Sequence, residues 1–116
     1  MGAAISTNPI VECQSKSQWE AEFEASKLSN KLLMIDFTAT WCGPCKRMEP
    51  VIEDWAARYP DVQFIKIDVD RLEDVARAFG VDVLPAYVFL KKGKEIDRVV
   101  GVKKDELERK IEKHRV

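Results

Sequence analysis

A short apolar segment followed at once by a cysteine pair restricts the fold of this chain more than any other feature. Residues 32–37, "LLMIDF", form a nearly continuous apolar run, which is typical of a strand covered on both faces. The pair "CGPC" at 42–45 follows after four intervening residues, and apolar residues at helical spacing continue from it to Trp55. A buried strand that leads directly into a helix indicates a sheet with helices packed on it.

The rest of the chain continues this alternation. Further helices are expected at 17–28, where Ser17 and Glu20 have the form of a capping box, at 72–79, and around Leu107 and Ile111. Further strands are expected near Cys13, at 62–69, and at 86–90 and 95–100, with Gly93 in the turn that joins the last two as a hairpin. The order predicts an α/β fold with five strands, four helices and helices on both sides of the sheet.

Size and composition are those of an ordinary globular protein. The chain has 116 residues, of which 46% are hydrophobic and 34% charged, so one compact core is expected. We interpret residues 1–8 as a flexible N-terminal extension and residues 9–116 as a single domain. The net charge is −1 and basic residues are interleaved with acidic ones, so nucleic acid is not expected as a partner.

The beginning of the chain bears on its location. The first sixteen residues lack a positively charged start, a long apolar stretch and a small-residue cleavage site, so no secretory signal is expected. The longest apolar run is too short to cross a bilayer. A reducing compartment, the cytoplasm, is therefore expected, and there a cysteine pair is more often catalytic or metal-binding than structural.

The spacing of the pair suits thiol chemistry. A cysteine at a helix N-terminus faces unpaired N–H groups and the positive end of the helix dipole, which favour its thiolate. Cys42 is expected at this position, with Cys45 one turn into the helix and close enough to displace a partner from Cys42. Pro44 suits the first helical turn, and Gly43 leaves room for a substrate.

Three other uses of the pair agree less well with the sequence. A structural zinc site needs four ligands, and beyond the pair the chain holds only Cys13 and His114, in no second paired motif; no metal is expected. A permanent crosslink over so short a loop would stabilise the fold little. Hydrolysis by a cysteine and a histidine lacks its base, because we interpret His114, near the C-terminus, as a solvated residue at a helix end.

Asp36 is the second informative residue. It interrupts the apolar strand six positions before Cys42, where a charge is costly without a task or a partner. Desolvation would raise its pKa, which suits a group that exchanges a proton near neutral pH. The alternative is a partly wet strand. Lys66, inside "FIKI", is expected at an exposed strand position unless it pairs with Asp36.

The segment "DFTATWCGPCKRMEP" closely resembles the active-site segment of thioredoxins, and the resemblance extends from about residue 10 to the end. "LP" ahead of a hairpin and "VVGVKKDEL" agree with it, and "KLLMIDFTATWCGPC" is similar to the h-type branch of plants. The resemblance implies the thioredoxin fold, a central mixed sheet flanked by helices, with no cofactor. It implies Cys42 as nucleophile, Cys45 as resolving thiol in a reversible Cys42–Cys45 disulfide, and Asp36 as the buried acid with Lys66 beside it.

The resemblance also implies a substrate surface around the pair. Trp41 would shield the site, and Pro85 would be a cis proline that faces the cysteines. An apolar rim that docks substrates would comprise Leu84, Val100, Gly101 and Val102. Ala86 stands where the family usually has threonine, which leaves the finer substrate preference open.

The leading hypothesis is a protein-disulfide reductase, an electron carrier that acts on disulfide-containing target proteins. Its oxidised pair would be reset by an NADPH-dependent thioredoxin reductase, or by glutathione and glutaredoxin. Two alternatives stay open: a binding or scaffold protein of the same fold whose thiols do not turn over, and an oxidase or isomerase. Gly-Pro between the cysteines and the missing secretory signal disfavour the oxidase.

Two features lie outside this chemistry. Cys13 is interpreted as a small buried hydrophobic residue, with a regulatory disulfide or glutathione cap as the alternative. Residues 1–6, "MGAAIS", match the form of an N-myristoylation site at Gly2. A single myristoyl chain anchors only marginally, so we expect a cytoplasmic protein, in part and reversibly at membranes.

Overall fold

The computed structural model describes residues 9–116. Its strands are β1 (Val11–Glu12), β2 (Leu32–Thr38), β3 (Val62–Asp68), β4 (Ala86–Lys91) and β5 (Lys94–Val100). Its helices are α1 (Lys16–Lys27), α2 (Gly43–Arg58), α3 (Glu73–Ala78) and α4 (Lys104–His114). The alternation predicted from the sequence is confirmed across the described residues.

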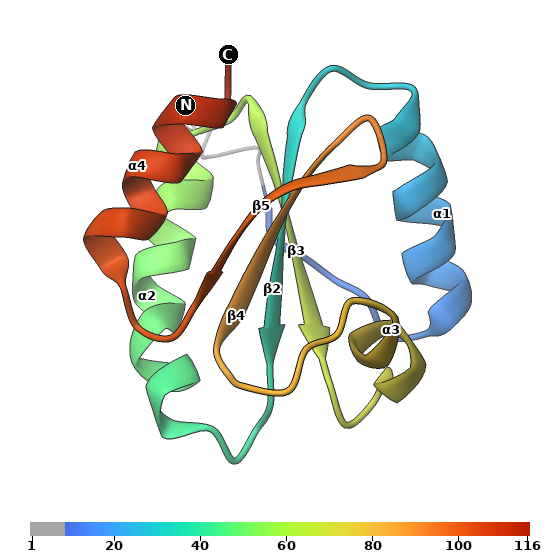
Figure 1. The fold of residues 1–116 in the computed structure, drawn as a ribbon, viewed down its shortest axis with the longest axis vertical. Helices are drawn as coiled ribbons and strands as arrows, with labels where there is room; N and C mark the ends of the chain where they lie inside the picture. Colours follow the sequence, from blue (N-terminus) through green and yellow to red (C-terminus); the bar gives the residue numbers. More distant parts are fainter. Residues whose placement is uncertain (1–8) are drawn as a thin grey trace, which may run out of the picture.

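The strands form one mixed sheet in the order β1-β3-β2-β4-β5 (Figure 1). β3 runs parallel to β1 and β2, whereas β4 runs antiparallel to β2 and β5. β2 is therefore the strand at which the parallel part of the sheet meets the antiparallel part. The expected central mixed sheet of the thioredoxin fold is confirmed.

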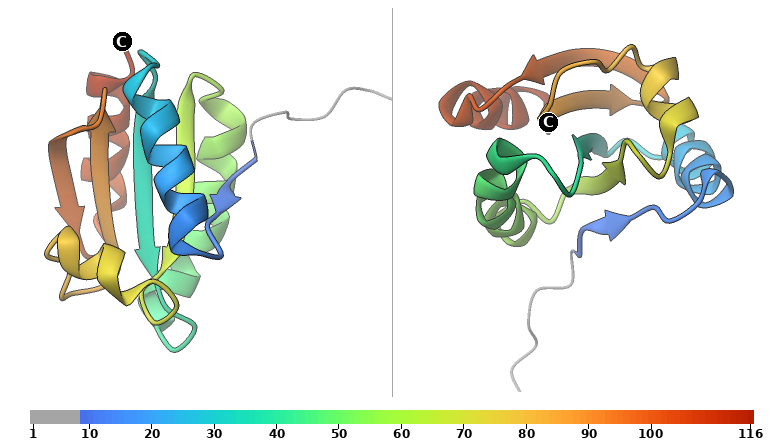
Figure 2. Two further views of the ribbon diagram at one scale, coloured as in Figure 1. Left: turned by 90° about the vertical axis from the view of Figure 1, so that its right-hand side faces the viewer. Right: turned by 90° about the horizontal axis from the view of Figure 1, so that it is seen from below.

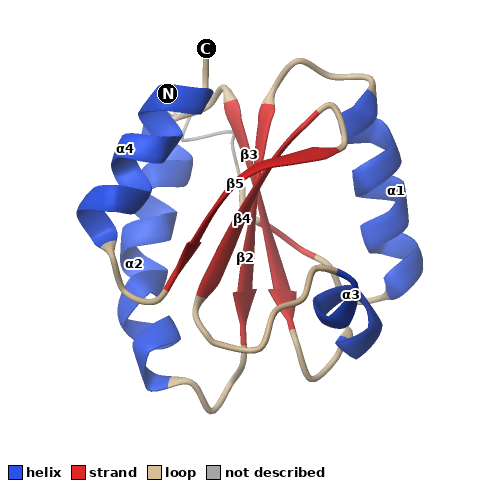
Figure 3. Cartoon of the chain, viewed as in Figure 1, coloured by secondary structure: helices blue, strands red, loops and turns tan. Residues whose placement is uncertain are grey.

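Helices cover both faces of the sheet, with α2 and α4 on one side and α1 and α3 on the other (Figures 2 and 3). The α2/α4 face includes Met34, Phe64, Tyr87 and Phe89 from the sheet, packed with Met48, Ile52, Trp55, Leu107 and Ile111. The α1/α3 face includes Leu33, Ile35, Phe37, Ile65 and Val88, packed with Trp19, Val75 and Ala76. Because both faces are covered, every residue of β2 is buried, as the continuous apolar run predicts.

The start of α1 differs from the expected one. The side chain of Ser15, not Ser17, caps the helix by accepting a hydrogen bond from the Gln18 amide at 3.1 Å. Ser15 has the extended backbone of an N-cap, and the Gln18 side chain accepts from the Gln14 amide at 2.7 Å. The capping box predicted at Ser17 and Glu20 is wrong because this earlier Ser and Gln pair already satisfies the first amides.

The hairpin turn is confirmed. Lys92 and Gly93 both have positive φ, 52° and 81°, which is the backbone of the two-residue turn that matches strand twist in hairpins. Gly93 provides this conformation without steric cost.

Within residues 9–116, no helix combines the length and apolar character needed to span a membrane.

Candidate active site

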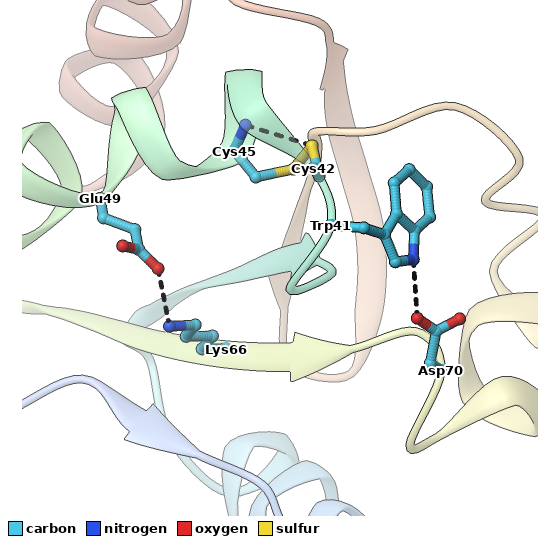
Figure 4. The surroundings of a disulfide bond; sticks show 6 residues. All are labelled: Trp41, Cys42, Cys45, Glu49, Lys66 and Asp70. Carbon is cyan, nitrogen blue, oxygen red and sulfur yellow. Dashed lines mark hydrogen bonds and ion pairs between the residues drawn. A yellow bond between two sulfur atoms is a disulfide. The ribbon is translucent and has the colours of Figure 1, made fainter.

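The cysteine pair lies where the chain passes from β2 into α2. Cys42 is the N-cap of α2, and its sulfur accepts a hydrogen bond from the Cys45 amide at 3.2 Å (Figure 4). The Cys42 carbonyl accepts from the Lys46 amide, also at 3.2 Å. Cys42 and Cys45 form a disulfide, with their Cα atoms 5.3 Å apart. The helix terminus thus directs an N–H group at Cys42, as the sequence predicts.

The pair is more covered than the sequence suggests. Cys42 and Cys45 are each only 4% exposed, and they pack with Ala39 and with the partly buried Val69 and Leu84. The flanking residues Trp41 and Gly43 are exposed, and Pro44 is half-buried. In the disulfide form the sulfurs therefore lie below a surface made by their neighbours.

Trp41 is held in place beside the disulfide. The residue is 69% exposed, yet its indole N–H donates to the Asp70 carboxylate at 2.8 Å. Asp70 follows the end of β3, and Figure 4 shows the ring directed from the pair toward it. Asp70 is a further residue of the site, because it fixes the orientation of an aromatic surface that water alone would leave free to rotate.

The segment before β4 packs near the pair. The Leu84–Pro85 peptide bond is cis, and Leu84 packs against the small buried cluster formed by Ala39, Cys42 and Cys45. The Pro85 carbonyl accepts from the Gly101 amide at 2.8 Å. Gly101 has φ +94°, a conformation that L side chains rarely adopt and that glycine adopts without strain.

Apolar side chains are exposed next to this segment. Val100, opposite Ala86 in the β4–β5 ladder, is 36% exposed and Val102 is 47% exposed. Val83, which the sequence analysis did not single out, is 54% exposed. The expected apolar rim of Leu84, Val100, Gly101 and Val102 stays a prediction, and Val83 and Trp41 add exposed apolar surface to the structure.

Asp36 is buried in β2, the strand that leads into the cysteine pair. It is only 8% exposed, and burial raises the pKa of its carboxyl from 3.8 to about 7. The positive charge of Lys66 opposes this rise in pKa, whereas the negative charge of Glu49 adds to it. The wet-strand alternative for Asp36 is wrong, since both faces of the sheet are covered there.

Lys66 has a different partner from the one considered. It lies opposite Asp36 in the parallel β2–β3 ladder, but its ammonium forms an ion pair with Glu49 of α2 at 3.2 Å (Figure 4). Burial would lower the pKa of Lys66, and the hydrogen bond and charge of Glu49 outweigh that and raise it. Lys66 is half-buried, so the interpretation as an exposed strand position is wrong. Its charge still faces Asp36.

His114 is not a solvated helix end. Its Nε2 lies 2.8 Å from the Asp97 carboxylate, and its side chain is only 16% exposed. The sequence interpretation is wrong because β5 places Asp97, 17 residues away in sequence, against the last turn of α4.

Within the part of the chain that the structure describes, no three His, Cys, Asp or Glu side chains lie close enough together to hold a metal ion.

Cys13 follows β1 and is fully buried in the core on the α1/α3 face. Burial, with a smaller contribution from Glu22, raises the pKa of its thiol to about 11. A buried thiol of high pKa is a poor nucleophile and a poor disulfide partner. The interpretation of Cys13 as a small hydrophobic residue is confirmed.

Gly2, the predicted acylation site, lies outside the described residues.

Besides Val83, two acidic residues of the site escaped the sequence analysis. Glu49 lies four residues after Cys45, so the helical period places both on one face of α2, and this signal could have found it. Asp70 is separated from Trp41 by 29 residues, and no local pattern links the two.

Known proteins are similar to this chain in sequence and fold. Residues 10–113 match the family model Thioredoxin. Thioredoxin H7 of Arabidopsis thaliana is 57% identical over 107 residues, which cover 92% of this chain and 83% of that protein. Thioredoxin H2 of the same plant is 46% identical over 114 residues, or 98% of this chain and 86% of that one. The crystal structure of thioredoxin NaTrxh from Nicotiana alata superposes with a TM-score of 0.92 at 53% identity, covering 100% of this chain and 99% of that one.

Proposed function

This chain belongs to the thioredoxin family and is a thiol-disulfide oxidoreductase that reduces protein disulfides; in that reaction, we propose, Cys42 is the attacking sulfur and Cys45 the resolving one. The position of Cys42 at the N-cap of α2 supports this order. Its sulfur receives the Cys45 amide hydrogen bond at 3.2 Å, and such a bond is stronger to a thiolate than to a thiol. Cys45 sits inside the helix, behind Cys42.

Asp36 takes the proton of Cys45 in this proposal. A carboxyl with a pKa of about 7 is half ionised near neutral pH, where a proton acceptor works best. Lys66 adjusts this pKa, because its positive charge favours the ionised carboxyl while Glu49 limits its effect. Cys45 then attacks the Cys42 sulfur, which breaks the mixed disulfide and releases the reduced target.

Target proteins dock on the apolar surface around the pair. The proposed docking residues are Trp41, Gly43, Pro44, Leu84, Pro85, Val100, Gly101 and Val102. Support comes from the exposure of Trp41, Val100 and Val102, and from the Gly101–Pro85 hydrogen bond, which ties two parts of that surface together.

The electron donor is proposed to be an NADPH-dependent thioredoxin reductase or glutathione with glutaredoxin. A similar solved chain comes from work on a yeast mitochondrial 1-Cys peroxiredoxin resolved via glutathione/thioredoxin systems, at 34% identity and a TM-score of 0.80. A cytoplasmic location follows from the same proposal, since this chemistry needs a reducing compartment. Reduction of the oxidised protein by each purified system, followed as NADPH absorbance, distinguishes the two donors.

Acylation of Gly2 is proposed from the sequence motif, with residues 1–8 as an extension to the domain of residues 9–116. A single acyl chain would make membrane residence reversible. Intact mass after co-expression with an N-myristoyltransferase tests this. An unmodified N-terminus would remove the membrane component.

Insulin-disulfide reduction, with dithiothreitol as electron source, tests the assignment of the sulfurs. The wild type should be much faster than Cys42→Ser. With Cys45→Ser, a target protein should accumulate as a mixed disulfide on Cys42, identified by mass spectrometry of the linked peptides. Linkage through Cys13 instead would refute the assignment.

A further inference from the structure

The hydroxyl of Tyr87 is a buried polar group that takes no part in the site described above. Tyr87 lies in β4, two residues beyond Pro85, and is fully buried. Its hydroxyl oxygen has no hydrogen-bond partner among the described residues. An unpaired buried hydroxyl destabilises a fold. Phenylalanine would fill the same space without that cost, so the hydroxyl calls for a function.

The sheet register places Tyr87 beside Asp36. The two residues are directly opposite in the antiparallel β2–β4 ladder, so their side chains project from the same face. That face is the one covered by α2, because Tyr87 packs with Met48 and Ile52 of this helix. Burial raises the pKa of Tyr87, and the nearby charge of Asp36 raises it further, so the phenol stays protonated and can donate.

The other charged groups that face Asp36 are engaged elsewhere. Lys66 approaches from β3 and Glu49 from α2, and these two are paired with each other at 3.2 Å. Cys45 of α2 is the proton donor of the reaction proposed above. Tyr87, from β4, is the neutral donor on this face whose hydrogen bond is not used within the described residues.

We propose that the Tyr87 hydroxyl donates a hydrogen bond, through one bound water molecule, to the ionised Asp36 carboxylate and so positions it as the proton acceptor of Cys45. The water is part of the proposal because the two side chains make no direct hydrogen bond. A buried polar site of this kind, with at least two polar partners, is where proteins hold internal water. The inference rests on the proposed role of Asp36.

The resolving step then proceeds with its atoms balanced. The Cys45 thiol gives its proton to Asp36, and the Cys45 sulfur bonds to the Cys42 sulfur. The bond from Cys42 to the target sulfur breaks, and its electron pair leaves with the target thiolate, which takes a proton from solvent. Asp36 later returns its proton to solvent. Tyr87 favours the ionised carboxylate before the transfer, and a hydrogen bond to the charged form lowers a carboxyl pKa.

The test is Tyr87→Phe, with Tyr59→Phe as the matched control. Tyr59→Phe removes the same hydroxyl group, but in the wild type that hydroxyl donates to Glu108 and Glu112 of α4. Two midpoints are measured: the carboxyl titration of Asp36 by ¹³C NMR, and the pH dependence of mixed-disulfide decay in acid-quenched single turnovers with a disulfide peptide. Both midpoints should rise by about one pH unit in Tyr87→Phe, and neither should move in Tyr59→Phe.

Asp36→Asn distinguishes the proposed role of Asp36 from that of Tyr87. If it slows mixed-disulfide decay while Tyr87→Phe leaves both midpoints at the wild-type value, the role of Asp36 stands and the role of Tyr87 is overturned. If Asp36→Asn changes no rate, the proton acceptor is misassigned, and the NMR titration of Tyr87→Phe still reports the hydrogen bond. In the double variant Asp36→Asn with Tyr87→Phe, the second substitution should add no further change in the pH profile.

Discussion

Replacing Asp36 with asparagine should stabilise the protein, by an amount that grows with pH. In the unfolded chain this carboxyl has its ordinary pKa of 3.8, and burial raises the value to about 7 in the folded protein. Between these values the unfolded chain has released its proton and the folded protein has not. The wild type therefore loses stability as the pH rises from about 4 to about 7, and the loss is constant above that range.

The size of the effect follows from the separation of the two pKa values. About three pH units correspond to about 4 kcal/mol of unfolding free energy above pH 7. At pH 4.5 the same linkage leaves a penalty of only about 1 kcal/mol. The asparagine side chain of the variant would carry no charge at any pH. The Asp36→Asn variant should thus gain about 3 kcal/mol more over the wild type at pH 8.5 than at pH 4.5.

Urea unfolding of the oxidised proteins, followed by tryptophan fluorescence across this pH range, measures the difference. Asp97→Asn is the matched control of opposite sign. Burial opposes the charge of Asp97, but hydrogen bonds from Lys110 and His114 outweigh it and hold its pKa below the usual range. Because its lowered pKa lies below the unfolded value of 3.8, that variant should lose stability by a nearly constant amount from pH 8.5 to 4.5, and the loss should shrink only below about pH 4. A gain for Asp36→Asn that stays level from pH 4.5 to 8.5 would refute the buried-carboxyl reasoning.

Three further predictions test neighbouring features. Glu49→Gln should lower the pKa of Asp36, because the Glu49 charge raises it and holds Lys66 at 3.2 Å; the ¹³C titration of Asp36 measures this, and an unchanged midpoint would mean that the ion pair does not act on the carboxyl. Gly101→Ala should destabilise the fold by about 1 kcal/mol through its φ of +94° alone, since a Cβ there meets no atom within 4 Å. Gly43→Ala, also free of contacts and without a positive φ, is its control in urea unfolding, and equal midpoints for the two variants would contradict the strain argument. Cys13 should resist iodoacetamide at pH 8 in the native oxidised protein and react fully in urea, because it is buried and its pKa is about 11; rapid native alkylation detected by mass spectrometry would show that the thiol is accessible.

Local features of the sequence predicted most of the fold. The run at 32–37 and the helix after the cysteines depend on neighbours within a few residues, and both appear as β2 and α2. The start of α1 was misplaced by a similar local choice, because Ser15 and Ser17 are each followed three residues later by a side chain that can complete a cap. Local chemistry alone does not decide between two such serines.

The candidate site was predictable in its sulfurs and less so in their surroundings. Cys42 and Cys45 depend on spacing along one helix. The partners of Lys66, His114 and Trp41 lie 17 or more residues away in sequence. Such pairs arise only when separate elements pack, so no periodicity in the chain reports them.

The position of β2 in the sheet has a consequence for how reactivity arises during folding. Asp36 lies between Lys66 on a parallel neighbour and Tyr87 on an antiparallel one. A peptide spanning only the strand and helix around the cysteines would keep both sulfurs and lose the dry surroundings that tune the acid. The thiols are therefore encoded locally, whereas their proton acceptor comes into being only when distant parts of the polypeptide have assembled, which couples full activity to completion of the native state.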